Sequence, residues 1–355
     1  MTVRKLCVVY SSFYCALITD VSFCVQQSPV LKNVSDWTWL HAIQYNPSQR
    51  LKNQNKVALF FQKEEVQPFS QLILSWNAFR PKKGFFTFDV RVRDKGSKAW
   101  SGWKKMHEWG SEMQKSFYGP SDGIAHVQYV RLEMEKYRSA DAFDVRIKAH
   151  KGASLQSITS CYVCTSTLSA FVSESIDYYQ TLDSVQIEGL PHYSQFLLEH
   201  AENNRICSPT SCSMVLGFLL KNKIAPLDFA NAVYDEGLDT YGNWSYNMAQ
   251  AYHVAEGKYK WYVTRLHSFW YLHQQLLKKL PIVVSVRGML QGAPKEYMNG
   301  HLLVVVGFDD KTKTVLCHDP AVISQEFVLQ KYPLESFLRA WERSHRLAYI
   351  VDYGK

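Results

Sequence analysis

Residues 206–216 read Ile-Cys-Ser-Pro-Thr-Ser-Cys-Ser-Met-Val-Leu. Pro209 suits the first turn of a helix because its missing N–H is not needed there, and the apolar residues after it continue the helix. Cys207 then lies at the helix N-terminus, where free backbone N–H groups and the helix dipole stabilise a thiolate. The stretch therefore predicts a cysteine nucleophile. The alternative is a buried structural cysteine, which is the interpretation we favour for Cys212 and Cys317.

A thiolate of this kind needs a base, and His301 is the candidate. It begins a long apolar run, where a polar ring is costly unless it has a partner. A hairpin turn centred near Asp310 would place Asp319 opposite His301, and its carboxylate would orient the imidazole. A His–Asp pair across a hairpin is by itself more often a surface contact, so this inference depends on Cys207. His318 should point to the opposite face and is the weaker candidate base.

Two further groups complete the predicted site. Gln195, twelve residues before Cys207, can supply an amide donor for the oxyanion that forms when sulfur attacks a carbonyl. Asn243 and Trp244 are candidates for substrate binding, since aromatic walls bury substrate surface and a few polar groups orient it. Ordinary packing is an equally good interpretation of that pair.

Length and composition predict two globular domains. The chain has 355 residues, is 46% hydrophobic and 14% aromatic, and can therefore fill two packed interiors. Its formal charge of +8 comes from 40 basic and 32 acidic residues without a long basic run, so we do not expect nucleic acid as a partner.

The N-terminus is typical of an export signal. Basic Arg4 and Lys5 precede a mostly apolar run, and residues 1–26 are the predicted signal peptide. A buried strand or helix is the alternative. No other stretch approaches the roughly 18 apolar residues of a membrane span, so we expect no stable span after signal removal and a secreted or cell-envelope (periplasmic) location.

Residues 27–172 are predicted to form an all-β sandwich, because short alternating strands are separated by turn clusters. The expected strands are residues 72–75, 84–93, 125–134, 142–148 and 155–163. Core packing is the favoured interpretation of its tryptophans, and a carbohydrate or envelope contact through this domain is the alternative. These residues are Trp76, Trp100, Trp103 and Trp109.

Residues 173–355 are predicted to hold helices followed by a buried sheet, which is an α+β arrangement. The expected helices are residues 209–220, 226–236, 246–256 and 268–280, and the expected strands are residues 282–286, 302–308, 314–317 and 348–351. Cys161 and Cys164 form a lone C-x-x-C on an expected strand, where the two side chains would face opposite ways. We therefore expect no metal site, and no organic cofactor either.

Five separated motifs occur in an order that resembles papain-like peptidases related to the bacteriocin-leader (double-glycine) processing peptidases. The likeness includes exported bacterial members with a β-rich domain before the peptidase and covers about residues 65–355. The motifs are Tyr193-Ser194-Gln195, Cys207-Ser208-Pro209-Thr210-Ser211, Tyr241-Gly242-Asn243-Trp244, Gly300-His301 with the apolar residues that follow, and His318-Asp319-Pro320-Ala321. In the front half, Ser75-Trp76-Asn77-Ala78 and Trp100-Ser101-Gly102-Trp103 also resemble these members.

The resemblance implies a papain-like fold in which Cys207 is the nucleophile, His301 the general acid/base, Asp319 the orienting residue and Gln195 the oxyanion donor. Ser208 departs from the family pattern, which has Gly, and a side chain there would harm activity if the position needed a positive φ.

We therefore expect a secreted cysteine peptidase that acts on a peptide or protein substrate through an acyl-enzyme intermediate. Two alternatives remain: a thiol acyltransferase or amidase of the transglutaminase type on the same site, and an inactive peptidase-fold binding protein.

Overall fold

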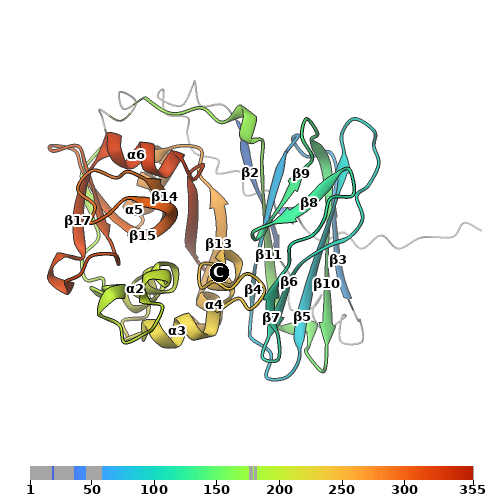
Figure 1. Cartoon of the computed structure of the whole chain (residues 1–355), viewed down its shortest axis with the longest axis horizontal. Coiled ribbons are helices and arrows are strands. Elements are labelled where there is room, and N and C mark those ends of the chain that lie inside the picture. Colours follow the sequence, from blue (N-terminus) through green and yellow to red (C-terminus); the bar gives the residue numbers. More distant parts are fainter. Residues whose placement is uncertain (1–17, 20–35, 45–57, 176–178, 180–181, 355) are drawn as a thin grey trace, which may run out of the picture.

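The computed structural model describes residues 18–19, 36–44, 58–175, 179 and 182–354, and Figure 1 shows them as two lobes side by side. The predicted signal peptide lies outside the described residues except for strand β1 (Ile18–Thr19), which pairs with β2 (Thr38–Gln44). None of the helices in the described part of the chain is long and apolar enough to cross a membrane.

The N-terminal lobe consists of two antiparallel sheets, which confirms the predicted β-sandwich. One sheet has the order β1, β2, β11 (Ile158–Ser166), β4 (Gln71–Ala78), β9 (Arg131–Met134) and β8 (Ala125–Gln128). The other has the order β3 (Ala58–Lys63), β10 (Ala140–His150), β5 (Phe85–Asp94), β6 (Lys104–Gly110) and β7 (Gln114–Ser116). The sheets meet where Trp76 of β4 stacks on Phe88 of β5, with 3.8 Å between ring centroids, and both rings are fully buried.

Residues 125–134 are not the single strand that their composition predicts. They form the hairpin β8–β9, with Gln128 paired to Arg131 and only Tyr129 and Val130 in the turn. Both turn residues have positive φ, at 38° and 55°. Turns of this kind normally use Asn and Gly, so Tyr-Val carries no turn signal in the sequence.

The C-terminal lobe is built on one antiparallel sheet and confirms the α+β class. Its strand order is β13 (Tyr259–Arg265), β18 (Leu347–Tyr353), β14 (Ile282–Gly288), β15 (Tyr297–Asp309), β16 (Thr314–His318) and β17 (Leu329–Pro333), with β12 (Val185–Gln186) also paired to β15. The helices are α2 (Cys207–Leu220), α3 (Pro226–Val233), α4 (Trp244–Val254), α5 (Phe269–Leu277) and α6 (Leu334–Glu342). The first four correspond to the predicted helices, and α6 was not predicted.

The two lobes share one continuous hydrophobic core, because α4 and β13 pack directly against β4 (Figure 1). Strand β13 is the edge of its sheet, and its free backbone groups would otherwise be open to pairing. Side chains of β4 cover them. Asn77 donates to Trp261 O at 2.5 Å and accepts from Trp261 N at 3.1 Å, and Ser75 Oγ accepts from Val263 N at 3.2 Å.

We predict that Asn77→Ala destabilises the whole chain. The substitution leaves the N–H and C=O of Trp261 buried without partners, at a cost of about 1 to 3 kcal/mol each. Urea denaturation should show a free energy of unfolding lower by about 2 to 5 kcal/mol. The exposed Asn299, changed to Ala, is the control and should stay within about 0.5 kcal/mol. Equal stability of the two variants would contradict the proposed capping of this edge.

Candidate active site

Cys207 is the first residue of helix α2, as the sequence predicted, and the structure shows it partly exposed. Its thiol faces His301 and the backbone N–H groups of Ser208 and Leu302, all of which favour the ionised form of the sulfur. One turn further along the helix, Ser211 Oγ donates to Leu302 O at 3.0 Å. Helix α2 and strand β15 are therefore joined at Leu302, directly after His301.

His301 lies on β15 directly after Gly300, whose φ of +89° is in the region that favours glycine. The hairpin register pairs Val304 with His318, two residues from the register we predicted, because Asp309 pairs with Thr314 and the turn is therefore centred after Asp310. A bulge between Val305 and Gly307 moves the register back by one residue. Continued past the end of β16, this register makes His301 the diagonal neighbour of Asp319, not its direct partner. Diagonal neighbours on one face still touch.

Asp319 is fully buried and receives four hydrogen bonds. His301 Nε2 donates to Oδ1 at 2.7 Å, and Ala321 N donates to the same oxygen at 2.8 Å. The hydroxyls of Tyr297 and Tyr332 donate to Oδ2 at 2.6 and 2.7 Å. A carboxylate held in this way is locked in its ionised form and cannot rotate.

The imidazole of His301 is oriented by this network. Its Nε2 is engaged by Asp319, so Nδ1 is the nitrogen left for the thiol of Cys207. The ring also stacks on Tyr297, with 4.1 Å between centroids and 15° between the ring planes. The stacking contact therefore holds the face of the ring, and the hydrogen bond to Asp319 holds its edge.

Electrostatics in the site favour a thiolate–imidazolium pair. Desolvation opposes the charged form of His301, but the charge and hydrogen bond of Asp319, together with Cys207, raise its pKa to about 9. Desolvation likewise opposes ionisation of Cys207, but His301 and the two backbone N–H groups outweigh it and lower the pKa of the thiol. The pKa of Asp319 is also lowered, because His301 and the two tyrosine hydroxyls outweigh the effect of burial.

Three other cysteines behave in the opposite way. Burial raises the pKa of Cys161, Cys212 and Cys317. Cys161 and Cys164 lie in β11 as free, buried thiols. Among the described residues, no group of three His, Cys, Asp or Glu side chains is placed to hold a metal ion.

We predict that Cys207 reacts with iodoacetamide in mildly acidic buffer, below the pH at which ordinary thiols react. Its pKa is lowered, whereas burial raises the pKa of Cys212 and Cys317, so Cys207 should be the first of the three thiols to ionise as the pH rises. The rate of peptide cleavage should fall above about pH 9, because His301 then loses the proton that the leaving group needs. Mass mapping of the alkylated protein across a pH series tests the prediction for Cys207. The pH profile of kcat/KM tests the prediction for His301. Labelling of Cys207 that begins only near pH 9 would contradict the ion pair.

Gln195 lies near the site, but none of the hydrogen bonds of the described residues joins it to Cys207. It is buried, its backbone N–H donates to Pro320 O at 2.8 Å, and its Nε2 donates to Asn203 O at 2.8 Å. Its Oε1 has no partner within the described structure. One amide hydrogen therefore remains for an oxyanion, and the predicted role of Gln195 stays a prediction.

Asn243 has a different role from the one its sequence suggested. It is fully buried as the N-cap of α4, where its Oδ1 accepts from Tyr246 N at 3.1 Å. Its Nδ2 donates to Ser116 of the N-terminal lobe at 2.7 Å and to Asp235 at 2.6 Å. Because both ends of the amide are occupied, these contacts make it a structural residue and leave nothing for substrate.

Trp244 and Ser208 are compatible with the prediction. Trp244 is half-buried, with its ring edge toward Tyr129. Ser208 does not need a positive φ, because it lies within α2, and its hydroxyl is hydrogen-bonded to Tyr349 OH at 3.0 Å. The replacement of Gly is therefore accommodated.

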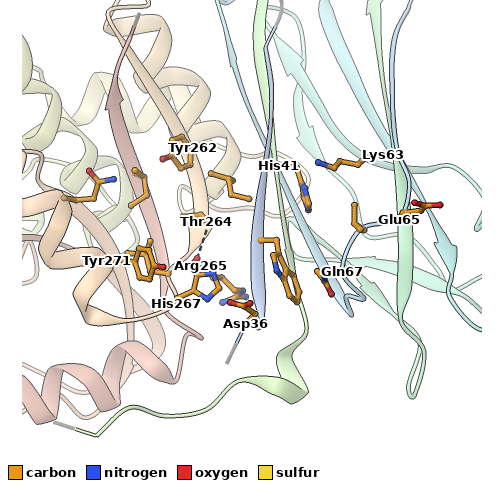
Figure 2. Close-up of a pocket in the computed structure, with 16 residues that line it drawn as sticks. Asp36, His41, Lys63, Glu65, Gln67, Tyr262, Thr264, Arg265, His267 and Tyr271 are labelled. Atoms are coloured by element: carbon orange, nitrogen blue, oxygen red, sulfur yellow. Dashed lines mark hydrogen bonds between the residues drawn. The ribbon is translucent and has the colours of Figure 1, made fainter. Parts of the chain in front are cut away.

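A pocket of about 480 Å³ lies elsewhere, between β2 and β13, and contains none of Cys207, His301 and Asp319. Figure 2 shows that its lining comes from both lobes, with Tyr262, Thr264 and Arg265 of β13 on one side and Lys63, Glu65 and Gln67 on the other. It is separate from the cysteine site.

Comparison with known proteins agrees with this geometry. Residues 187–349 match the Peptidase C39-like family, and residues 45–165 match the Peptidase C39 N-terminal domain. The chain is a C39-like cysteine peptidase. The family that the sequence motifs resemble is thereby confirmed, and both lobes of the C39-like peptidase have counterparts in it.

Solved structures that resemble this C39-like peptidase share little sequence with it. One, described as a C39-like peptidase from Bacillus anthracis, is 18% identical, with a TM-score of 0.37, covering 49% of this chain and 100% of that one. Another, xylellain, a cysteine protease from Xylella fastidiosa, is 13% identical, with a TM-score of 0.34, covering 52% of this chain and 91% of that one. None of the curated proteins compared with the chain matches it.

Sequence reasoning missed the two tyrosines on Asp319. Tyr297 lies four residues before His301, and in a regular strand the two would be about 13 Å apart. An irregularity in the pairing of β15 with β14 brings the two rings together, and the sequence does not mark it. Tyr332 lies on β17, and only the pairing of β17 with β16 brings it near Asp319. Nothing in its local sequence marks it.

Proposed function

We propose that the C39-like peptidase hydrolyses peptide bonds with a Cys207–His301–Asp319 triad through a thioester acyl-enzyme. The observation that carries the proposal is the position of the His301 imidazole, which lowers the pKa of the Cys207 thiol on one side and donates from Nε2 to the buried Asp319 carboxylate at 2.7 Å on the other. This is the arrangement that an activated cysteine nucleophile requires.

In the first half-reaction, the thiolate of Cys207 attacks the carbonyl carbon of the scissile peptide bond. The electron pair of the carbonyl moves onto its oxygen, where the N–H of Cys207 at the helix start and the amide of Gln195 are the proposed donors. As the C–N bond breaks, protonated His301 gives its proton to the departing amine. The products are the free amine and a thioester on Cys207.

In the second half-reaction, neutral His301 removes a proton from water, and the resulting hydroxide attacks the thioester carbonyl. The C–S bond breaks, the thiolate returns, and His301 again carries the proton. Asp319 remains ionised throughout and holds the imidazole in place. No redox step occurs, and a water molecule is the only co-reactant.

Acyl transfer to an amine differs from hydrolysis only in the second nucleophile, so products decide between them. Incubation with peptides and an excess of a primary amine, followed by mass spectrometry, should show peptide fragments that have gained water. Fragments carrying the added amine as the main product would assign the protein to the transferases.

We also propose that the protein is exported, as a secreted or cell-envelope enzyme. The support is the basic and then apolar order of the first residues. N-terminal sequencing of the protein made by secreting cells tests it, and a mature chain that still begins at Met1 inside the cells would refute it.

A further inference from the structure

The pocket between the two lobes contains a buried cation. Arg265 of β13 lines this pocket and is only 5% exposed. Its guanidinium donates to Ser344 O at 2.7 Å, to His345 O at 2.9 Å and to Gln71 Oε1 at 2.6 Å. Its Nε has no hydrogen-bond partner among the described residues. All three acceptors are neutral, so within the described part of the chain no carboxylate in contact with Arg265 balances its charge.

A second buried arginine, Arg346, shows the opposite arrangement. It is 1% exposed, and two carboxylates contact it at 2.6 and 3.0 Å. The carboxylate of Glu133 reaches Arg265 only through Gln71, whose Nε2 donates to it at 3.1 Å. A buried charge without a counterion is costly, because burial removes its hydration. The pocket is therefore short of one negative charge, which a bound anion can supply.

The charged residues at the surface of the pocket do not remove this deficit. Asp36 and Glu65 also line the pocket, but both are exposed, so water and salt screen their charges. Burial lowers the pKa of Arg265 to about 10, and the side chain therefore remains a cation at neutral pH. The pocket thus has a positive charge in its buried part and negative charges in its exposed part.

The rest of the lining suits a ligand with a non-polar body. The volume of about 480 Å³ lies within the range of about 300 to 1,000 Å³ that is usual for pockets holding small organic molecules. Leu266 and Ile350 are buried in the wall, and Tyr262 and Tyr271 add aromatic rings from the peptidase lobe (Figure 2). Gln275 is 4% exposed and also lines the pocket, and its Oε1 has no partner among the described residues, so it can accept an N–H or O–H.

We propose that the pocket between the lobes binds a small carboxylate with a non-polar body, the chemistry of an N-acylated amino acid, with its carboxylate paired to Arg265. A carboxylate gains a charge-assisted hydrogen bond from the guanidinium. One buried cation balances one negative charge, so a carboxylate fits better than a phosphate group, which carries about two at neutral pH. The site lies apart from Cys207, His301 and Asp319 and does not depend on the function proposed for them.

Isothermal titration calorimetry of the full-length protein with N-acetylphenylalanine tests the proposal, because this probe has one carboxylate, a non-polar ring and an amide N–H. We expect saturable binding, and binding at least about tenfold weaker for N-acetylphenylalaninamide, which lacks the charge. Arg265→Gln should weaken binding of the acid about tenfold or more and leave binding of the amide unchanged. Lys82→Gln is the matched control, since it removes an exposed positive charge that does not line the pocket, and it should leave both affinities unchanged.

Tyr271→Ala tests the pocket independently if Arg265→Gln does not fold. Tyr271 is half-buried and lines the pocket, so loss of its ring should weaken binding of the acid severalfold. The proposal is overturned if the wild type shows no saturable binding, if it binds acid and amide equally, or if either substitution leaves the affinity for the acid unchanged. Tighter binding of inorganic phosphate than of the acid would also overturn it.

Prior alkylation of Cys207 with iodoacetamide locates the probe. We expect the affinity for N-acetylphenylalanine to stay unchanged, because the pocket contains none of the three triad residues. Loss of binding after alkylation would place the probe at the cysteine site and overturn the inference.

Discussion

Cys207→Ala should lower kcat/KM on any cleaved peptide by at least about 10⁴-fold, because the substitution removes the atom that attacks the carbonyl and leaves only substrate binding and oxyanion donors. The loss should fall on kcat, since the thiolate acts in the transition state and contributes little to ground-state binding. Digestion of a peptide library, with cleavage sites identified by mass spectrometry, gives the activity, its dependence on sulfur and the cleavage preference in one measurement.

Cys212→Ala is the matched control for this experiment. It removes a second thiol from the same helix, α2, but that thiol is buried and its pKa is raised. We expect kcat/KM within a few-fold of the wild type, with some loss of stability from the small cavity. Comparable cleavage by Cys207→Ala and the wild type would show that the activity belongs to another group or to a contaminant, and would reject the triad.

Much of the site could be predicted from local sequence because its parts lie at element boundaries. Cys207 precedes Pro209 at a helix start, and His301 follows a glycine at the start of an apolar run, so each is visible within a few residues. The helix and strand types follow from periodicity for the same reason. The hairpin register that predicts Asp319 is wrong by two residues. His301 and Asp319 are nevertheless in contact, because diagonal neighbours in a sheet are close enough to touch.

The rest of the site depends on contacts between distant segments, which local patterns do not encode. The residue types at Asn243 and Trp244 are typical of a substrate cleft. The amide of Asn243 nevertheless links helix α4 to Ser116 of the other lobe. The hairpin tip at Tyr129 carries no turn residues, so composition extends a strand through it. Its conformation is set by the neighbouring lobe, and sequence reasoning that treats each lobe alone cannot find it.

The shared core explains why the N-terminal lobe belongs to the enzyme. The edge of the peptidase sheet is closed by Ser75 and Asn77, which lie in one of the motifs that resemble the family. Between them, Trp76 packs in the sandwich core against Phe88. One short strand thus serves both lobes, with alternate side chains facing each of them.

Asp319→Asn should separate the effect of the negative charge at this position from the effect of the shape of the side chain. The amide keeps an oxygen that can accept from His301 Nε2, but the negative charge that raises the pKa of His301 to about 9 is lost. The pKa of the imidazole should then fall toward its ordinary value of about 6.5, since desolvation now acts with less opposition. The basic limb of the kcat/KM profile should move to lower pH by at least about one unit, and activity at pH 8 should drop about 10- to 100-fold.

Asp319→Ala removes the acceptor as well as the charge and should cost about 10³-fold or more, because the imidazole loses its orientation and the hydroxyls of Tyr297 and Tyr332 lose their partner. Tyr332→Phe is the matched control, because it changes the same buried hydrogen-bond network around Asp319. It removes one donor and keeps the charge, so the basic limb should move little and activity should stay within about tenfold of the wild type. If Asp319→Asn lowers activity while its basic limb stays near pH 9, the carboxylate is not the cause of the raised imidazole pKa. The ion pair with Cys207 would then need a different origin, because the charge of Asp319 is what allows a buried imidazolium to exist beside the helix start.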